Sequence, residues 1–396
     1  MKLRVLSLLV CSLAFAFAGC SSGEKEEVDA GQIIIGHVTD SHIWHICDYN
    51  SKSGKHTVAV NLPIILVDNG KLDIFSSKQF HHGHAVYSGK NSSYALIGGG
   101  ASKEEIIRVK QIDVATDDGN VASTQPVGYD AENDIFVDHE GKSYAVLHDE
   151  DGSLSKPVDL SLTKISMSII FAVVILFAIV FGVGRQYKKR KGMAPHGFQS
   201  LIEMLVLHVR DGIVAPILKK NTDRFLPYLL TLFFFIILCN VMGLIPFFPA
   251  GVTVTGNLAV TGILALITFV ITNVCGNKHY WKDIFNTPGV PAWLKIFPLM
   301  PVIEFTGIFI KPFVLMIRLF ANMTGGHIIL LGFVVFVLSL SNSMGLAAGG
   351  VASVVSVLFS VFIYALELLV AYIQAFVFTM LTTLYISMAI EEPEEA

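Results

Sequence analysis

Charged side chains are scarce in this sequence. Asp, Glu, Lys and Arg make up only 15% of its 396 residues, whereas 53% are hydrophobic. This balance excludes an ordinary soluble enzyme and predicts an integral membrane protein. The formal net charge of −4 also lacks the basic excess that nucleic acid binding needs. We therefore expect the lipid bilayer, and no nucleic acid, as a partner.

Enzyme motifs and cysteines are scarce as well. The sequence contains no GxSxG elbow, no HExxH motif and no P-loop, so no nucleotide site is expected in this chain. We expect a non-catalytic chain without a cofactor or a metal ion. Of the five cysteines, Cys11 lies in the leader, and Cys239 and Cys275 lie in or beside apolar runs. No disulfide framework is expected.

The first 19 residues have a basic start, a short apolar run and a small-residue site, which together predict a secretory signal peptide. Two processing routes stay open. Cleavage after Ala18 would be ordinary secretion. Alternatively, "FAGC" is similar to a bacterial lipoprotein processing site, in which Cys20 would become the acylated first residue. Phe17 stands where that pattern usually has an aliphatic residue.

Residues 20–160 predict a small extracytoplasmic domain rich in β-strands. Alternating runs such as "HTVAVNLPIILV" and "SYAVLHD" are separated by turn signals such as "DNGK" and "HEGKS". The domain holds most of the histidines: His37, His42, His45, His56, His81, His82, His84, His139 and His148. The tract "HHGH" raises the question of a metal, but no spaced Cys/His site accompanies it. Solvated surface histidines are the favoured interpretation.

Residues 161–396 predict a membrane domain. Ile165–Gly184 is uncharged and long enough to cross a bilayer once. The basic run "RQYKKRKG" follows, and the positive-inside rule places it in the cytoplasm and the preceding domain outside. Residues 198–220 predict an amphipathic helix on the cytoplasmic membrane surface. Two more spans are expected at roughly Phe225–Phe247 and Asn257–Val274.

The last hundred residues are too long for simple spans. Val351–Ile390 contains neither Pro nor Gly, and a continuous helix of that length would extend about 60 Å, twice the thickness of the hydrocarbon. The run of roughly Pro298–Leu340 is similarly overlong. We expect a steeply tilted or in-plane antiparallel hairpin that turns near "SNSMGLAAGG". The expected fold is thus an all-α integral membrane protein with this hairpin, plus the small β-rich domain.

Few ionisable groups interrupt this apolar region, and such groups are costly in a membrane unless they are paired or hydrated. Glu304, Lys311 and Arg318 recur every seven residues and share one helix face, with Asn322 one turn beyond. The other polar positions are His327, Glu367 and Gln374. If the two helices are antiparallel, their polar stripes can face each other and enclose a hydrated crevice.

Structural interpretations of the same residues stay open. Arg318 could pair with Glu304 or Glu367, and His327 with Glu367 could form a buried pair without a transport role. Lys311 could be an interfacial lysine whose stem lies along apolar surface. Glu304 could simply lie next to Lys311 on a hydrated face of the helix.

The motifs "NVMGLIP", "EFTGIFIKPFVLMIRLFANMTGGH" and "YIQAFVFTMLTTLYISMA" occur in this order between residues 160 and 390. They resemble the signature of subunit a of F-type ATP synthases. "GHVTDSHIWH" is similar to that family's short external arm, and an insert of about a hundred residues follows it. The insert is longer than many members carry.

The resemblance implies roles for individual residues. Arg318 resembles the arginine that faces the carboxylates of the c-ring, Gln374 the glutamine near it, and Asn322 the asparagine after it. Glu304 and Lys311 match polar positions upstream. Many bacterial members have glutamate and histidine where this chain has His327 and Glu367, the reverse order, which indicates that the two side chains meet as a proton-access pair.

The resemblance further implies an ion-translocating stator with two half-channels, located in a bacterial inner membrane with its C-terminus in the cytoplasm. Its partners would be the c-ring, the peripheral-stalk b subunits and the rest of the ATP synthase. Protons or sodium ions both stay open, and the His/Glu pair favours protons. The alternatives are a secondary ion transporter, which typically shows internal repeats, and a membrane-anchored binding lipoprotein.

Overall fold

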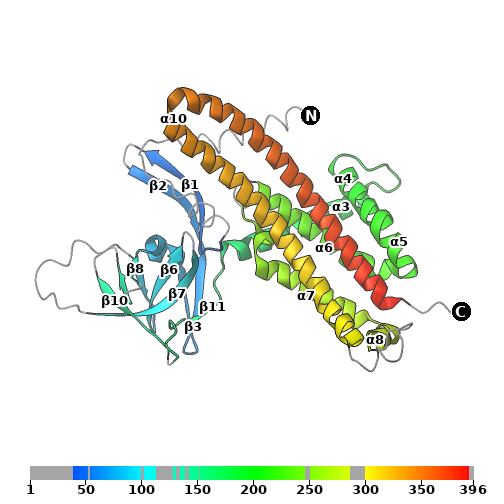
Figure 1. Cartoon of the computed structure of the whole chain (residues 1–396), viewed down its shortest axis with the longest axis horizontal. Helices are drawn as coiled ribbons and strands as arrows, with labels where there is room; N and C mark the ends of the chain where they lie inside the picture. Colours follow the sequence, from blue (N-terminus) through cyan, green and yellow to red (C-terminus); the bar gives the residue numbers. More distant parts are fainter. Residues whose placement is uncertain are drawn as a thin grey trace, which may run out of the picture. The chain divides into compact units, whose positions relative to one another are not determined.

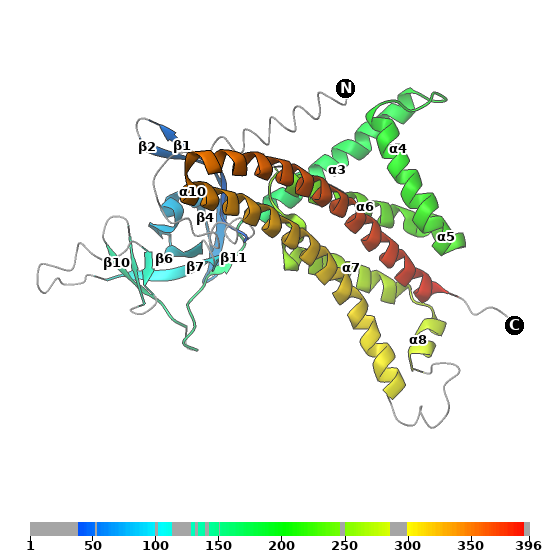
Figure 2. The ribbon, with the colours of Figure 1, turned by 45° about the horizontal axis from the view of Figure 1, so that its top comes forward.

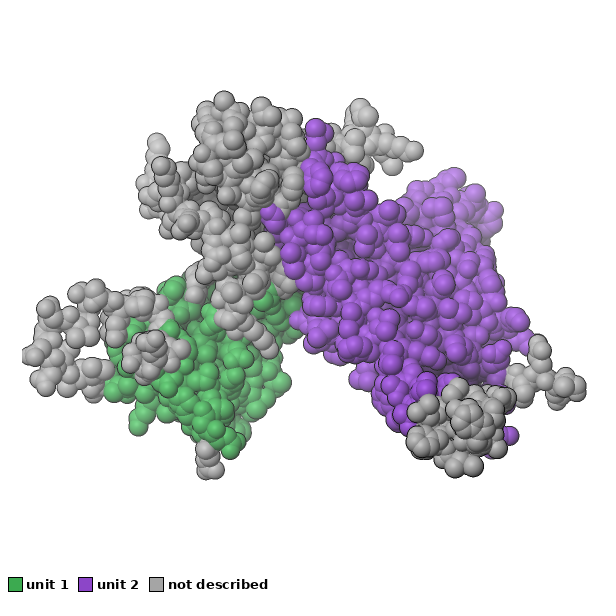
Figure 3. Space-filling model, viewed as in Figure 1, with its two compact units in different colours: residues 1–168, 246–248 green, residues 169–245, 249–396 purple. Residues whose placement is uncertain are grey.

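A computed structural model describes residues 39–51, 54–99, 102–112, 128–130, 134–138, 142–149, 151–245, 250–285 and 299–391. The predicted signal peptide and Cys20 lie outside these residues. The chain divides into two compact units, which Figure 3 colours separately. Unit 1 comprises residues 1–168 and 246–248, and unit 2 comprises residues 169–245 and 249–396.

Unit 1 is built from antiparallel strands, as the alternating runs predict (Figure 1). Strands β1 (Ile43–Ser51) and β2 (Gly54–Asn61) pair with each other. A three-stranded sheet has the order β11-β3-β4, with bounds Val158–Asp159, Pro63–Asp68 and Lys71–Ser76. A six-stranded sheet has the order β5-β6-β7-β10-β9-β8, with bounds Val86–Ser88, Ser93–Gly99, Ser102–Gln111, Ser143–Val146, Ile135–Val137 and Gly128–Asp130.

The core of unit 1 follows from period-two alternation. On β3, Ile64 and Leu66 are buried against Phe80 and Tyr94. Successive side chains of a strand point to opposite faces, so the residues between them face outward. Phe80 belongs to the 3-10 helix η1 (Ser77–Gly83), which contains the first three residues of the "HHGH" tract and has His84 as its C-cap. Among the residues that the structure describes, no group of three or more His, Cys, Asp or Glu side chains could hold a metal ion.

A buried charge cluster lies within unit 1, near Lys164 at the start of the first apolar helix. His42 Nδ1 lies 3.3 Å from Glu104 Oε2, and its Nε2 lies 3.1 Å from Asp159 Oδ2. Burial alone lowers the pKa of His42, but the hydrogen bonds and charges of Asp159 and Glu104 outweigh it and raise the pKa to about 9. Next to this cluster, Lys164 N donates to Ser41 O at 3.0 Å, which fixes the start of the helix.

Unit 2 is helical, and four helical stretches in the described part of the chain are long and apolar enough to cross a membrane. They are Lys164–Lys189, Phe198–Leu244, Leu258–Cys275 and Leu358–Ile390. The first is α3, whose first turn belongs to unit 1, and the third is α7. A short helix α8 (Lys278–Phe285) follows α7. The expectation of a multi-pass helical membrane protein is confirmed.

The stretch Phe198–Leu244 has 47 residues, whereas about 20 residues suffice to span the hydrocarbon. It consists of two helical segments. A first helical segment contains α4 (Phe198–Val209), the π-helical turn η2 (Arg210–Val214) and α5 (Ala215–Leu218). Lys219 has a φ of 46°, in the left-handed region, which ends this segment. Helix α6 (Thr222–Leu244) then begins, and the two segments share one apolar core.

Helix α10 runs from Leu299 to Ile390 and doubles back on itself (Figures 1 and 2). We call residues 299–332 its first arm and residues 358–390 its second arm. The antiparallel pair that the overlong runs predict is therefore present. Residues 341–350, near which the turn was expected, are themselves helical. Both arms contribute to the core that α6 and α7 share.

Candidate functional site

The two arms of α10 bring together one acid and one imidazole. His327 lies on the first arm and Glu367 on the second, and both are buried. His327 Nε2 is 3.5 Å from Glu367 Oε1. The two residues are 40 positions apart in the sequence, so only the fold-back of α10 can pair them. A buried carboxylate beside a histidine is an arrangement that can hold and pass a proton.

A glycine makes this pairing sterically feasible. A Cβ placed on Gly326 would lie 2.9 Å from Glu367 Oε1 and 3.3 Å from its Cγ and Cδ. These distances are shorter than ordinary van der Waals contact, so the Glu367 side chain occupies the space that any other residue would fill. The neighbouring Gly325 has no atom within 4 Å of its Cβ position. Of these two glycines, only Gly326 is needed for the close approach of the arms.

A second polar pair lies beside the first. Asn322 Nδ2 donates to Gln374 Oε1 at 2.7 Å. From His327 to Asn322 the first arm steps back five residues, while the second arm steps forward seven from Glu367 to Gln374. Opposite steps are the register of antiparallel helices, so both pairs belong to one polar seam between the arms. We call these four residues the polar seam.

Helix α6 and the 3-10 helix η4 (Val254–Gly256) support the polar seam from behind. The buried Asn240 of α6 donates to Ala371 O at 3.2 Å, and Thr255 Oγ1 donates to Asn240 Oδ1 at 2.7 Å. Thr324 Oγ1 also donates to Gly256 O at 3.3 Å. Because each buried amide group needs partners, these bonds fix the second arm against α6 and the first arm against η4.

Arg318 lies one turn before Asn322, and its side chain is exposed. Its neighbours Leu315 and Leu319 are buried, whereas Arg318 and Ile317 are exposed. Arg318 forms no ion pair with any residue that the structure describes, so it is not held by Glu304 or Glu367. A guanidinium keeps its charge, and in a membrane such an outward-facing charge needs an acidic partner from another chain or water.

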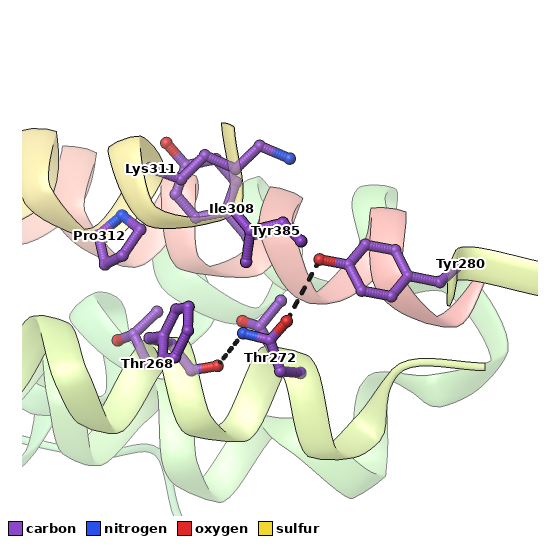
Figure 4. A pocket seen from close by; sticks show the side chains of 9 residues that line it. Thr268, Thr272, Tyr280, Ile308, Lys311, Pro312 and Tyr385 are labelled. Carbon is purple, nitrogen blue, oxygen red and sulfur yellow. Dashed lines mark hydrogen bonds between the residues drawn. The ribbon is translucent and has the colours of Figure 1, made fainter. Parts of the chain in front are cut away.

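Lys311 and Glu304 lie apart from the polar seam. Lys311 Nζ lies 5.6 Å from the centroid of the Tyr385 ring, which is a cation–π distance, and Glu304 is exposed. Lys311 and Tyr385 line a cavity of about 20 Å³, room for one water molecule. Figure 4 shows Thr272 of α7 and Tyr280 of α8 in the same lining.

Sequence reasoning missed several of these polar groups. Asn240 lies within the motif "NVMGLIP", but neither it nor Thr255, Thr272 and Tyr280 was predicted as a site residue. The signal for Asn240 was available, because an amide within an apolar span is costly unless it is bonded. The hydroxyl groups gave no such signal, since a Ser or Thr can bond to its own helix, as Thr379 Oγ1 does with Ala375 O.

Two regions of the chain match known protein family models. Residues 165–387 match the family model described as ATP synthase A chain, and residues 33–135 match a domain of unknown function. The first match covers more than half of the chain. The second lies within unit 1.

Individual relatives agree with the first match. ATP synthase subunit a of Chloroherpeton thalassium is 41% identical over 236 residues, which cover 59% of this chain and 67% of the relative. ATP synthase subunit a 2 of Chlorobium luteolum is 37% identical over 279 residues, 68% of this chain and 79% of the relative. ATP synthase subunit a of Myxococcus xanthus is 42% identical over 246 residues, 60% of this chain and 76% of the relative. The chain belongs to the family of ATP synthase subunit a.

Proposed function

We propose that this chain is the proton-translocating stator subunit of an F-type ATP synthase, with no nucleotide site of its own. The observation that carries the proposal is the pairing of His327 with Glu367 across the two arms of α10, beside an outward-facing Arg318, in a member of this family. Its partners are the c-ring, the peripheral-stalk b subunits and the remaining subunits. Neither alternative function explains this combination.

Arg318 acts as a charge barrier between two half-channels. A ring carboxylate can cross lipid only when it is neutral, because a bare charge in hydrocarbon is costly. Beside Arg318 the carboxylate is held ionised, since an opposite charge favours the charged form. The carboxylate therefore releases its proton into one half-channel and takes up a new proton from the other. Arg318 also blocks direct proton hopping, because a guanidinium does not give up its own proton.

The two half-channels are proposed at opposite ends of the first arm. His327 and Glu367 relay protons in the external half-channel, and Asn322 and Gln374 orient the groups next to Arg318. The cavity that Lys311 lines, together with the exposed Glu304, belongs to the cytoplasmic half-channel. This orientation is supported by the basic run at the end of α3, which the positive-inside rule places in the cytoplasm. It leaves unit 1 outside a bacterial inner membrane and the C-terminus inside.

The decisive experiment uses the assembled complex in inverted membrane vesicles. Arg318→Ala should abolish ATP synthesis and ATP-driven proton pumping while the complex still assembles. Arg318→Lys should also fail, because an ammonium lacks the planar fork and can lose its proton when buried. Lys282→Ala, which removes a cation from α8, is the matched control and should pump normally. Full pumping by Arg318→Ala would refute the proposal, as would purification without a c-ring.

A further inference from the structure

The outer face of the three-stranded sheet in unit 1 is apolar. Strand pairing aligns Leu72 of β4 with Val67 of β3, and Val67 with Val158 of β11. Directly paired residues lie on the same face of an antiparallel sheet. The adjacent row on that face contains Ile74 paired with Ile65, and Leu160 N donates to Ile65 O at 2.9 Å.

These two rows form a six-residue surface, which we call the aliphatic face: Ile65, Val67, Leu72, Ile74, Val158 and Leu160. The exposed fractions are 50% for Leu72, 62% for Ile74, 61% for Val158 and 60% for Leu160. The opposite face of the same strands carries the buried core of unit 1. Isolated exposed apolar residues are common, but a contiguous set marks a contact surface.

The position of the aliphatic face in the chain indicates what covers it. Leu160 precedes Lys164, the first residue of α3, by four residues, which span at most about 14 Å when extended. Beyond this point α3 carries exposed apolar side chains such as Ile170, Val174 and Phe177. The aliphatic face is thus continuous in the chain with a surface that faces lipid.

We propose that the aliphatic face rests on the lipid bilayer, with its side chains in the boundary between head groups and acyl chains. All six side chains are branched aliphatics without a polar group, which suits the acyl boundary. Unit 1 would then be a membrane-associated domain, held by the lipid as well as by α3. The proposal requires that α3 crosses a membrane and does not depend on proton conduction by unit 2.

The test uses the full chain in its assembled complex in native membranes. The photo-crosslinking amino acid benzoyl-phenylalanine replaces Ile74 in one variant and Leu160 in another. Lys110, an exposed residue of β7 in the six-stranded sheet, is the matched control position. These side chains are exposed, so the replacement leaves the core unchanged. Mass spectrometry after illumination identifies each adduct.

Lipid adducts at positions 74 and 160 should exceed those at position 110 severalfold, because only the first two probes would lie in the acyl boundary. With the probe at position 160, the additional change Ile74→Glu should reduce the lipid adduct severalfold. An adduct to a second copy of the chain or to another subunit would overturn the proposal. A lipid yield no greater than that at position 110 would do the same.

Discussion

Gly326→Ala is the substitution that tests the polar seam most directly. The added Cβ would lie 2.9 Å from Glu367 Oε1 and 3.3 Å from Cγ and Cδ. Because Glu367 is buried between the arms, its carboxylate cannot swing into solvent to make room. It must instead shift along the seam, away from the 3.5 Å contact that it makes with His327. Asn240 of α6 bonds to Ala371 O and not to this carboxylate, so the fold should persist.

The size of the effect follows from the overlap. Overpacking by one methyl group costs about 1–3 kcal/mol in a packed interior. If that cost appears in the barrier to proton transfer between Glu367 and His327, the rate falls by about 5- to 150-fold. A proton transfer also needs its two heavy atoms at about 2.6–3.2 Å, so a widened gap acts in the same direction.

The assay is ATP-driven proton pumping in inverted vesicles, normalised to the amount of assembled complex. Gly325→Ala is the matched control, because it makes the same chemical change at the preceding residue and meets no atom within 4 Å. It should pump at the native rate, and the gain in helix propensity should leave it at least as stable. Equal pumping by both variants would refute a role for the His327–Glu367 contact in transport.

Two further predictions concern buried polar groups. The pKa of His42 is about 9, above the ordinary 6.5, so its pairing stabilises unit 1 fully below pH 6.5 and is lost as the pH rises through 9. The free energy of unfolding should fall by up to about 3 kcal/mol between pH 6.5 and pH 9. Because Asp159 is partly exposed to water, which screens its charge, the measured fall should be smaller than this upper value. Proteolysis in rising urea at pH 6 and pH 9.5 measures this in the full chain, and a pH dependence that survives His42→Gln would contradict it. Asn240→Ala should destabilise unit 2 by about 2–3 kcal/mol, because Ala371 O and Thr255 lose a partner. A thiol-reactive dye that reports exposure of the buried Cys239 should show an earlier thermal transition, whereas an unchanged midpoint would exclude this support of the arms.

Much of the membrane part was predictable from the sequence. The predicted spans Ile165–Gly184 and Asn257–Val274 correspond to α3 and α7, because a bilayer requires about 20 apolar residues in a helix. The fold-back of the last hundred residues followed from length alone. The sequence predicted only the place of the turn. It did not predict that residues 341–350 are helical, because glycine is unfavourable inside a helix.

The sequence predicted the ionisable residues of the candidate site but not the residues of α6 and η4 that hold the two arms in place. Arg318, His327 and Glu367 are conspicuous because ionisable groups within an apolar run carry a large cost. Asn240 and Thr255 gave weaker signals, and their importance depends on the partners that folding provides. The same holds for the aliphatic face, since alternation cannot tell which face of β3 lies in the core when both faces carry apolar residues.

The sequence by itself determined the membrane class, the spans and the few polar residues that a bilayer would otherwise reject, because these follow from solvation costs that act on each residue separately. The tertiary structure alone decided the contacts. It joined His327 to Glu367 across 40 residues, selected Gly326 over Gly325 as the residue that must stay small, and left Arg318 facing outward. Such contacts depend on the register of two packed helices, and register is set by the whole interface.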